Sequence, residues 1–253
     1  MRKKDLGFEP SHIVIIPLRN EETRSKGQVI KDEFLTHPNV LSATLSNGYP
    51  AGELAATGYF PEGYGDKDPW LIYHFAVDPD FIDKTMNMQI INGRNFSTEF
   101  TTDSTAVLIN EVLLKRLAWG DPIDKIIQAD RAEGTKYRVI GVIKNFHNQS
   151  LHQQINPIML RFLRGQPRYL IIKLMPDQPS VTLLALEEAW ESINPEIPLN
   201  YEFLDERIAG FYEDDQKMGK IFIYFTLFAL LIAALGLYGL ASFIAEQRTK
   251  EIG

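Results

Sequence analysis

Residue types that could do chemistry are present, but their spacing favours no reactive site. His147 and His152 are the closest histidines, and five residues apart they share neither a helix face nor a strand face. We therefore expect two ordinary loop histidines rather than metal ligands. The carboxylates of segments 66–68 (Asp-Lys-Asp) and 78–80 (Asp-Pro-Asp) lack the further oxygen ligands of a calcium loop. We predict solvated turn carboxylates at both places.

The common catalytic and nucleotide-binding motifs do not occur. The sequence contains no G-x-x-x-x-G-K-[ST], no H-E-x-x-H and no G-x-S-x-G. It has no cysteine, which excludes disulfides, thiolate metal sites and a cysteine nucleophile. Carboxylates are plentiful, but nothing singles out one pair for hydrolysis. We expect no enzymatic activity, no cofactor and no metal.

Composition separates a water-soluble part from a very apolar part. The chain has 253 residues, and its net charge of -7 argues against nucleic acid as a partner. Residues Ile221–Ala245 carry no charge and, as a helix, are longer than the roughly 30 Å hydrocarbon core of a bilayer. We predict a transmembrane helix there. Just before it, the acidic cluster of residues 213–215 suggests a solvated helix face, with contact to a basic partner as the alternative.

Small residues recur along one side of the predicted transmembrane helix. Ala229, Ala233 and Gly236 follow a spacing of four and then three residues. Small side chains let helix backbones approach closely, which is how membrane helices associate. These residues therefore predict helix packing within the membrane.

The water-soluble part begins and ends with the same order of predicted elements. Each end reads strand, helix, strand, which predicts a split β-α-β sheet with helices on one face. In the first helix, Val29, Ile30, Phe34 and Leu35 are expected to point inward. The predicted elements are 12–17, 22–37 and 40–46 at the start, and 169–174, 180–193 and 199–204 at the end.

The middle of the chain predicts an inserted α+β lobe. Residues 47–68 are rich in Gly, Pro and small residues and indicate a loop. Short elements follow, many of them strands. From Asp205 onward the pattern is helical, and no proline interrupts it before the membrane segment. The predicted strands are 70–77, 106–110, 136–144 and 157–163, and the predicted helices are 80–86 and 111–118.

The N-terminus has a basic start but no apolar run long enough for a signal peptide. Two explanations fit this pattern. In the first, the folded part is cytoplasmic and anchored by its C-terminal helix. In the second, an upstream transmembrane helix is missing, and the chain is a fragment. We favour truncation at both ends.

Five segments of the chain form a recognisable series. They are, in order, 91–96 (INGRNF), 106–111 (AVLINE), 120–123 (GDPI), 137–157 (YRVIGVIKNFHNQSLHQQINP) and 236–253 (GLYGLASFIAEQRTKEIG). Together they resemble ABC transporter permeases of the MacB/FtsX type, which carry a MacB-like periplasmic core domain between their first two membrane helices. The resemblance spans nearly the whole chain, and the order of the segments is also that of the family. One departure is Asp124, where the family tends to carry glycine.

The resemblance implies an α+β fold with a two-lobed periplasmic domain, a stalk and a membrane helix. The lobe made of split β-α-β units would be interrupted by the inserted lobe. It also implies residence in the inner (plasma) membrane, with the large domain in the periplasm. The implied bounds are 1–212 for the core domain, with lobe one at 1–50 and 165–212 and the inserted lobe at 51–164, then 213–245 for stalk and membrane helix and 246–253 for the start of a cytoplasmic coupling segment.

The partners implied by the resemblance are a separate cytoplasmic ABC ATPase, a second permease copy in a dimer, a periplasmic adaptor and membrane lipid. Arg248, Lys250, Glu251 and Gly253 would contact the ATPase. Hydrolysis by that ATPase would move the periplasmic domains and expel a substrate. The alternative is a sensory or binding ectodomain on a single membrane span, in a signalling or adaptor protein.

Overall fold

The computed structural model describes residues 6–65, 68–129, 134–148 and 154–252; in the last helix it describes the side chains of residues 204–210 and 221–241. It forms two compact units, Met1–Ile208 and Ala209–Gly253, each described by itself. The α+β class predicted from the sequence is confirmed.

Most elements of the chain are strands, and all of them except the greater part of α5 lie in the first unit. The helices are α1 (Glu21–Ser25), α2 (Gly27–Leu35), a π-helical turn η1 (Phe81–Thr85), a 3-10 turn η2 (Thr101–Thr105), α3 (Glu111–Leu117), α4 (Pro179–Ile193) and α5 (Leu204–Ile252). The strands are β1 (Ile13–Pro17), β2 (Val40–Ser46), β3 (Ala55–Pro61), β4 (Trp70–Val77), β5 (Ile90–Gly93), β6 (Ala106–Asn110), β7 (Ile126–Gln128), β8 (Lys136–Ile143), β9 (Ile158–Phe162), β10 (Tyr169–Leu174) and β11 (Glu202–Phe203).

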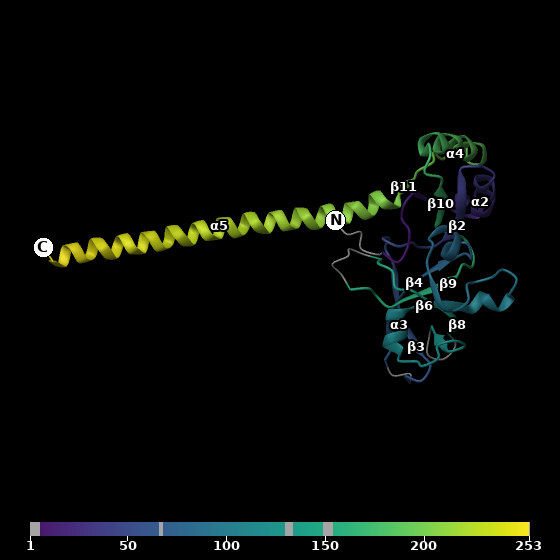
Figure 1. Ribbon diagram of the computed structural model, residues 1–253, viewed down its shortest axis with the longest axis horizontal. Coiled ribbons are helices and arrows are strands. Elements are labelled where there is room, and N and C mark those ends of the chain that lie inside the picture. Colours follow the sequence, from purple (N-terminus) through teal and green to yellow (C-terminus); the bar gives the residue numbers. More distant parts are fainter. Residues whose placement is uncertain (1–5, 66–67, 130–133, 149–153, 253) are drawn as a thin grey trace. The chain divides into compact units, whose positions relative to one another are not determined.

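Lobe one is the predicted split β-α-β sheet. Its strand order is β11-β1-β10-β2, and all neighbours are antiparallel. Helices α2 and α4 lie side by side over this sheet (Figure 1) and share an apolar core with alternate residues of β1, β2 and β10. Trp190 of α4 is almost fully buried in that core, and its indole N–H donates to the Ile197 carbonyl at 2.6 Å.

The inserted lobe closes its strands into a ring. The order β4-β3-β7-β8-β6-β9 returns to its start because β9 also pairs with β4. Strand β5 is added at β8. A second apolar core, which includes Tyr59, Ile109 and Met159, is packed by α3 through Leu113 and Leu117.

The first helical segment differs from its prediction. Lys26 separates α1 from α2, and the buried face of α2 consists of Gly27, Ile30, Lys31 and Phe34. Val29 is 58% exposed and Leu35 is 41% exposed, so their predicted inward position was wrong. The face is rotated because Lys31 takes an inward position, where it meets two carboxylates.

Two other segments also depart from the predictions. The predicted loop 47–68 contains β3, which pairs with β4 over Ala55–Tyr59. Sheet pairing overrides the turn-rich composition there, because β4 offers a long partner. The predicted strand 199–204 shrinks to the two residues of β11, because α5 already begins at Leu204.

The second unit consists of the remainder of α5, which runs unbroken from Leu204 to Ile252. Within the described residues, Ile221–Ala241 are long and apolar enough to cross a membrane, with a mean hydropathy of 2.4 and no buried part.

Left-handed backbone occurs at Gly93, in the INGRNF segment, and at Asp124, directly after the GDPI segment. Gly93 has a φ of 75°, and a Cβ there would lie 2.7 Å from the Gly141 Cα and overlap the Ile140 carbonyl oxygen. Asp124 has a φ of 63° and still makes its turn, donating from its N–H to the Val139 carbonyl at 2.9 Å. Glycine adopts such a backbone without the steric cost that a side chain brings.

We expect Asp124→Gly to raise the free energy of unfolding by about 0.5–1 kcal/mol, because it relieves left-handed strain. The ion pair lost with Arg138 is 3.5 Å long and exposed on both sides, so it is worth little. Gly93→Ala is the matched opposite and should lower the free energy by about 2–4 kcal/mol. Urea titration of residues 1–208 measures both; a stabilised Gly93→Ala would contradict the assigned backbone.

Candidate functional site at the junction of the two lobes

The two lobes are joined by a narrow strand pairing. Strands β2 and β4 pair at only one position, where Ser46 lies opposite Val77. Immediately after β4, the Asp78 N–H donates to the Leu45 carbonyl at 3.0 Å. So short a ladder leaves the relative position of the lobes to nearby side chains.

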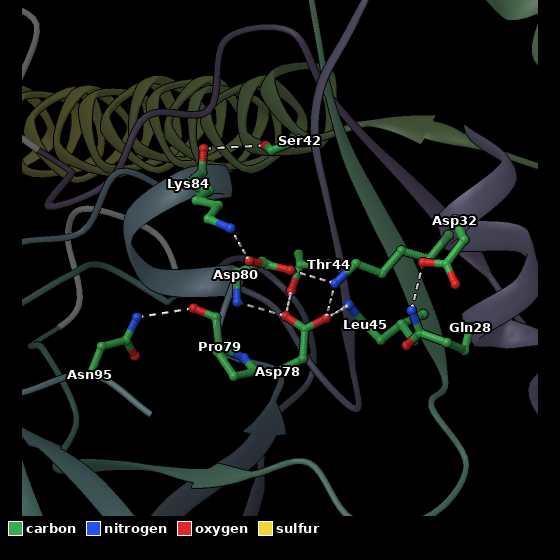
Figure 2. Close-up of polar contacts among 11 residues, drawn as sticks. Gln28, Asp32, Ser42, Thr44, Leu45, Asp78, Pro79, Asp80, Lys84 and Asn95 are labelled. Atoms are coloured by element: carbon green, nitrogen blue, oxygen red, sulfur yellow. Dashed lines mark hydrogen bonds and ion pairs between the residues drawn. The ribbon is translucent and has the colours of Figure 1, made fainter. Parts of the chain in front are cut away.

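A buried ion cluster lies at this junction. The Lys31 ammonium of α2 lies 2.7 Å from Asp78 Oδ2 and 2.6 Å from Asp80 Oδ2. Asp78 also accepts from the Leu45 N–H at 2.8 Å and from the Thr44 hydroxyl, as Figure 2 shows. We call Lys31, Asp78 and Asp80 the Lys31 cluster. It connects α2 and β2 of lobe one with the segment that follows β4.

Burial and charge set the protonation of this cluster. Burial opposes the charge on Lys31, whose side chain is 7% exposed, but the pull of Asp78 and the hydrogen bonds to both carboxylates raise its pKa. Burial alone would raise the pKa of Asp80, yet the hydrogen bonds from Lys31 and Lys84 lower it. Lys84 lies 2.7 Å from Asp80 on the exposed side (Figure 2). Two ammonium groups therefore face two carboxylates.

This result corrects one prediction. The carboxylates of Asp78 and Asp80 were expected to be solvated, but their side chains are only 14% and 27% exposed. The sequence signal that could have found them is the lysine at an inward position of α2.

The INGRNF segment supports the same loop from the other side. The Asn95 amide donates to the Pro79 carbonyl and to the Asp83 carboxylate, both at 2.9 Å (Figure 2 shows the first bond). The neighbouring Arg94 makes a two-bonded ion pair with the buried Asp103, at 2.7 and 2.6 Å. This segment therefore holds the loop that carries the two aspartates.

The AVLINE and IKNF segments interlock in the inserted lobe. Glu111 accepts from the Asn145 N–H at 2.8 Å, and Asn145 accepts from the Val112 N–H at 2.9 Å. Asn110 caps α3 by accepting from the Leu113 N–H at 3.0 Å. These polar residues satisfy backbone groups, so their role here is structural.

A groove of about 330 Å³ opens beside the Lys31 cluster. Its wall includes Arg24, Gln28 and Asp78, with Phe162 and Pro167 from the strand β9 and the turn before β10. Among the described residues, no group of three His, Asp or Glu side chains could hold a metal. The charged groups at the junction pair with one another.

The residues predicted to pack helices lie in α5. Ala229, Ala233 and Gly236 are exposed in the single chain, and a Cβ on Gly236 would meet nothing within 4 Å. Arg248, Lys250 and Glu251 lie in the last turns of α5, but their side chains are outside the described residues.

Several other predicted positions also lie outside the described residues. These are Gly253, His152, Asp66 and Lys67, together with the side chains of the acidic cluster 213–215. His147 is described; its N–H donates to the Leu6 carbonyl at 2.9 Å. The prediction that these two histidines are ordinary loop residues therefore stays a prediction.

We expect Lys31→Met to lower the free energy of unfolding by about 2–4 kcal/mol, because it leaves two carboxylates half-buried without their ammonium. Lys84→Met is the matched control: Lys84 pairs with the same Asp80 but is 70% exposed, so its loss should be under about 1 kcal/mol. The contribution of Asp80 to the free energy of unfolding should be complete above its ordinary pKa of 3.8. It should disappear as the pH falls through the lowered pKa of the folded state. Equal losses in both variants, measured by urea titration at pH 7, would refute the assignment.

Comparison with known proteins places this geometry in a family. The chain is similar to the periplasmic region of MacB from Actinobacillus actinomycetemcomitans, with 13% identity, a TM-score of 0.57 and coverage of 81% of this chain and 94% of that one. It is also similar to the extracellular domain of the noncanonic ABC-type transporter YknZ from Gram-positive bacteria, with 14% identity, a TM-score of 0.53 and coverage of 75% and 97%.

At these identities, the likeness to solved structures shows a shared fold. Comparison with curated protein sequences gives no match. The family described as MacB-like periplasmic core domain matches residues 11–185, which include the inserted lobe, most of lobe one and the Lys31 cluster. Because this match covers more than half of the sequence, the chain belongs to the MacB-like periplasmic core domain family.

Proposed function

We propose that this chain is the permease part of an ABC-type transporter. One observation carries the proposal: a MacB-like periplasmic core domain over residues 11–185 is followed by an apolar helix, Ile221–Ala241, long enough to cross a membrane. The first unit would lie in the periplasm, and α5 would cross the inner membrane. The similar solved structures are a periplasmic region and an extracellular domain, which supports this placement.

In this proposal the chain transmits movement and does no chemistry. ATP would be hydrolysed by a separate cytoplasmic ATPase, which would contact Arg248, Lys250, Glu251 and Gly253. Helix α5 is unbroken from Leu204 to Ile252, so a displacement at its cytoplasmic end has a continuous helical path. The folded unit would then move and expel a substrate, with a periplasmic adaptor as a further partner.

The exposed seam of α5 suits a second copy of the permease. Ala229, Ala233 and Gly236 leave room for a neighbouring backbone, and lipid gives little drive for association by itself. Close packing at this seam would place two permeases side by side in one transporter, with lipid around the rest of the helix.

We expect opposite positions for the two ends of the chain. In the full-length protein, an alkaline phosphatase reporter inserted at Gly134 should be active, and one joined after Gly253 should be inactive. The enzyme folds only outside the cytoplasm, so it reports the side of the membrane. The reverse pattern would indicate a cytoplasmic domain anchored by its tail.

Reversing one charge should weaken the contact with the ATPase. We expect Glu251→Lys in the full-length protein to reduce co-purification of the ATPase at least tenfold, because like charges at a buried contact cost up to several kcal/mol. Glu187→Lys, the same reversal on the exposed face of α4, is the control and should leave recovery unchanged. Equal recovery of the ATPase with both variants would remove this role from residues 248–253.

A further inference from the structure

The beginning of α5 has little backbone support in the first unit. Strand β11, which leads into it, pairs with β1 at two positions only, Val14 with Phe203 and Ile15 with Glu202. Leu204, the first residue of the helix, is fully buried. Side-chain contacts in the next turn therefore add to the support of residues 204–208 within the first unit.

Arg207 makes these contacts within the first unit. Its Nε donates to the Ala51 carbonyl at 2.9 Å, and its Nη1 donates to both carboxylate oxygens of Glu202 at 3.1 Å. Its guanidinium carbon lies 5.5 Å from the centre of the Tyr49 ring. The Tyr49 hydroxyl in turn donates to Glu202 at 2.8 Å. We call Arg207, Glu202, Tyr49 and the Ala51 carbonyl the Arg207 cluster.

The loop bound by Arg207 is the segment through which the chain passes from lobe one to the inserted lobe. Residues 47–54 connect β2 with β3. A Cβ on Gly48 would lie 2.7 Å from the Phe75 Cβ, so the loop backbone lies directly against β4. Tyr49 is 4% exposed and packs edge-on against Tyr169 of β10 at 4.9 Å. One loop thus contacts both lobes and the base of α5.

The backbone of this loop is constrained as well. Ala51 has a φ of 66°, a left-handed conformation that a residue with a side chain rarely adopts. The Gly52 N–H donates to the Tyr49 carbonyl at 3.1 Å and closes a turn around it. The Ala51 carbonyl that receives the Arg207 bond is therefore presented by a defined turn.

We infer that Arg207 is the positioning residue through which movement of α5 reaches the connection between the two lobes. Arg207 can have this role only if the chain works as the permease part proposed above, so the assignment rests on the proposed function. The side chains of Arg207 and Glu202 are 33% and 41% exposed, so water screens their ion pair and its weight in stability is small. Loss of transmission should therefore be separable from loss of folding.

The test uses the full-length protein reconstituted with its ATPase in lipid vesicles. Residues 1–253 include no cysteine, so a single cysteine introduced among them meets no competing labelling site in this part of the protein. Two single-cysteine proteins are labelled separately: Ala209→Cys reports α5 just beyond Arg207, and Lys136→Cys reports β8 in the inserted lobe. Both positions are exposed. The distance between the same label on the two permease copies is measured with and without ATP and vanadate. The variants are Arg207→Gln, Arg207→Lys and, as the matched control, Arg164→Gln at an exposed arginine.

In the wild type and in Arg164→Gln, ATP should shift the distance distribution at both labels. In Arg207→Gln the shift at Ala209 should remain, while the shift at Lys136 should fall below half of the wild-type value, with ATP turnover retained. Arg207→Lys keeps the charge but lacks the planar fork that serves Ala51 and Glu202 together, so its shift should be intermediate. The thermal midpoint should fall by no more than about 4 °C.

Two failures are distinguishable. If neither label responds to ATP in the wild type, the proposed function fails. If both labels respond in Arg207→Gln as in the wild type, the proposed function stands and the role of Arg207 is refuted. A fall of the thermal midpoint by more than about 10 °C in Arg207→Gln would make Arg207 a folding residue and would also overturn the assignment.

Discussion

The narrow pairing between β2 and β4 is the constraint on which the rest of the folded unit depends. One residue pair cannot define the angle between a split β-α-β sheet and a ring of strands. The Lys31 cluster helps to fix this angle, because an ammonium held by two carboxylates from the other lobe tolerates little displacement. A buried ion pair is costly to form, but it favours one relative position of the two lobes when each partner is fixed in its own lobe.

The family-like segments can be understood from this constraint. INGRNF holds the aspartate loop through Asn95, and its Gly93 allows β5 to approach β8 closely. AVLINE and IKNF lock α3 to the neighbouring strands through Glu111 and Asn145. In the described residues these contacts hold backbone groups in place. Of the segments that carry the resemblance, INGRNF supports the junction, whereas AVLINE and IKNF stabilise the inserted lobe.

The sequence predicted most of this fold but little of the junction. Strands such as 40–46, 70–77 and 169–174 were recognisable because their apolar runs are bounded by turn residues. Strand β3 was not, because its stability comes from a partner that no local pattern reveals. The Lys31 cluster was missed for a related reason: the helical spacing of Lys31 indicates its inward position, but its partner Asp78 is 47 residues away. No local pattern connects Arg207 with Ala51 either, because they are 156 residues apart.

The closure of the inserted strands into a ring limits how other proteins can bind to this unit. A ring has no free strand edge, and β5, the strand added to it, has only four residues. In lobe one the side of β2 that faces β4 is more open, because it pairs there at Ser46 alone. A partner that binds by adding its own strand would therefore find few backbone groups to pair with in the inserted lobe. Recognition of the inserted lobe is expected to depend on side chains. For the same reason, aggregation by strand pairing between inserted lobes is disfavoured.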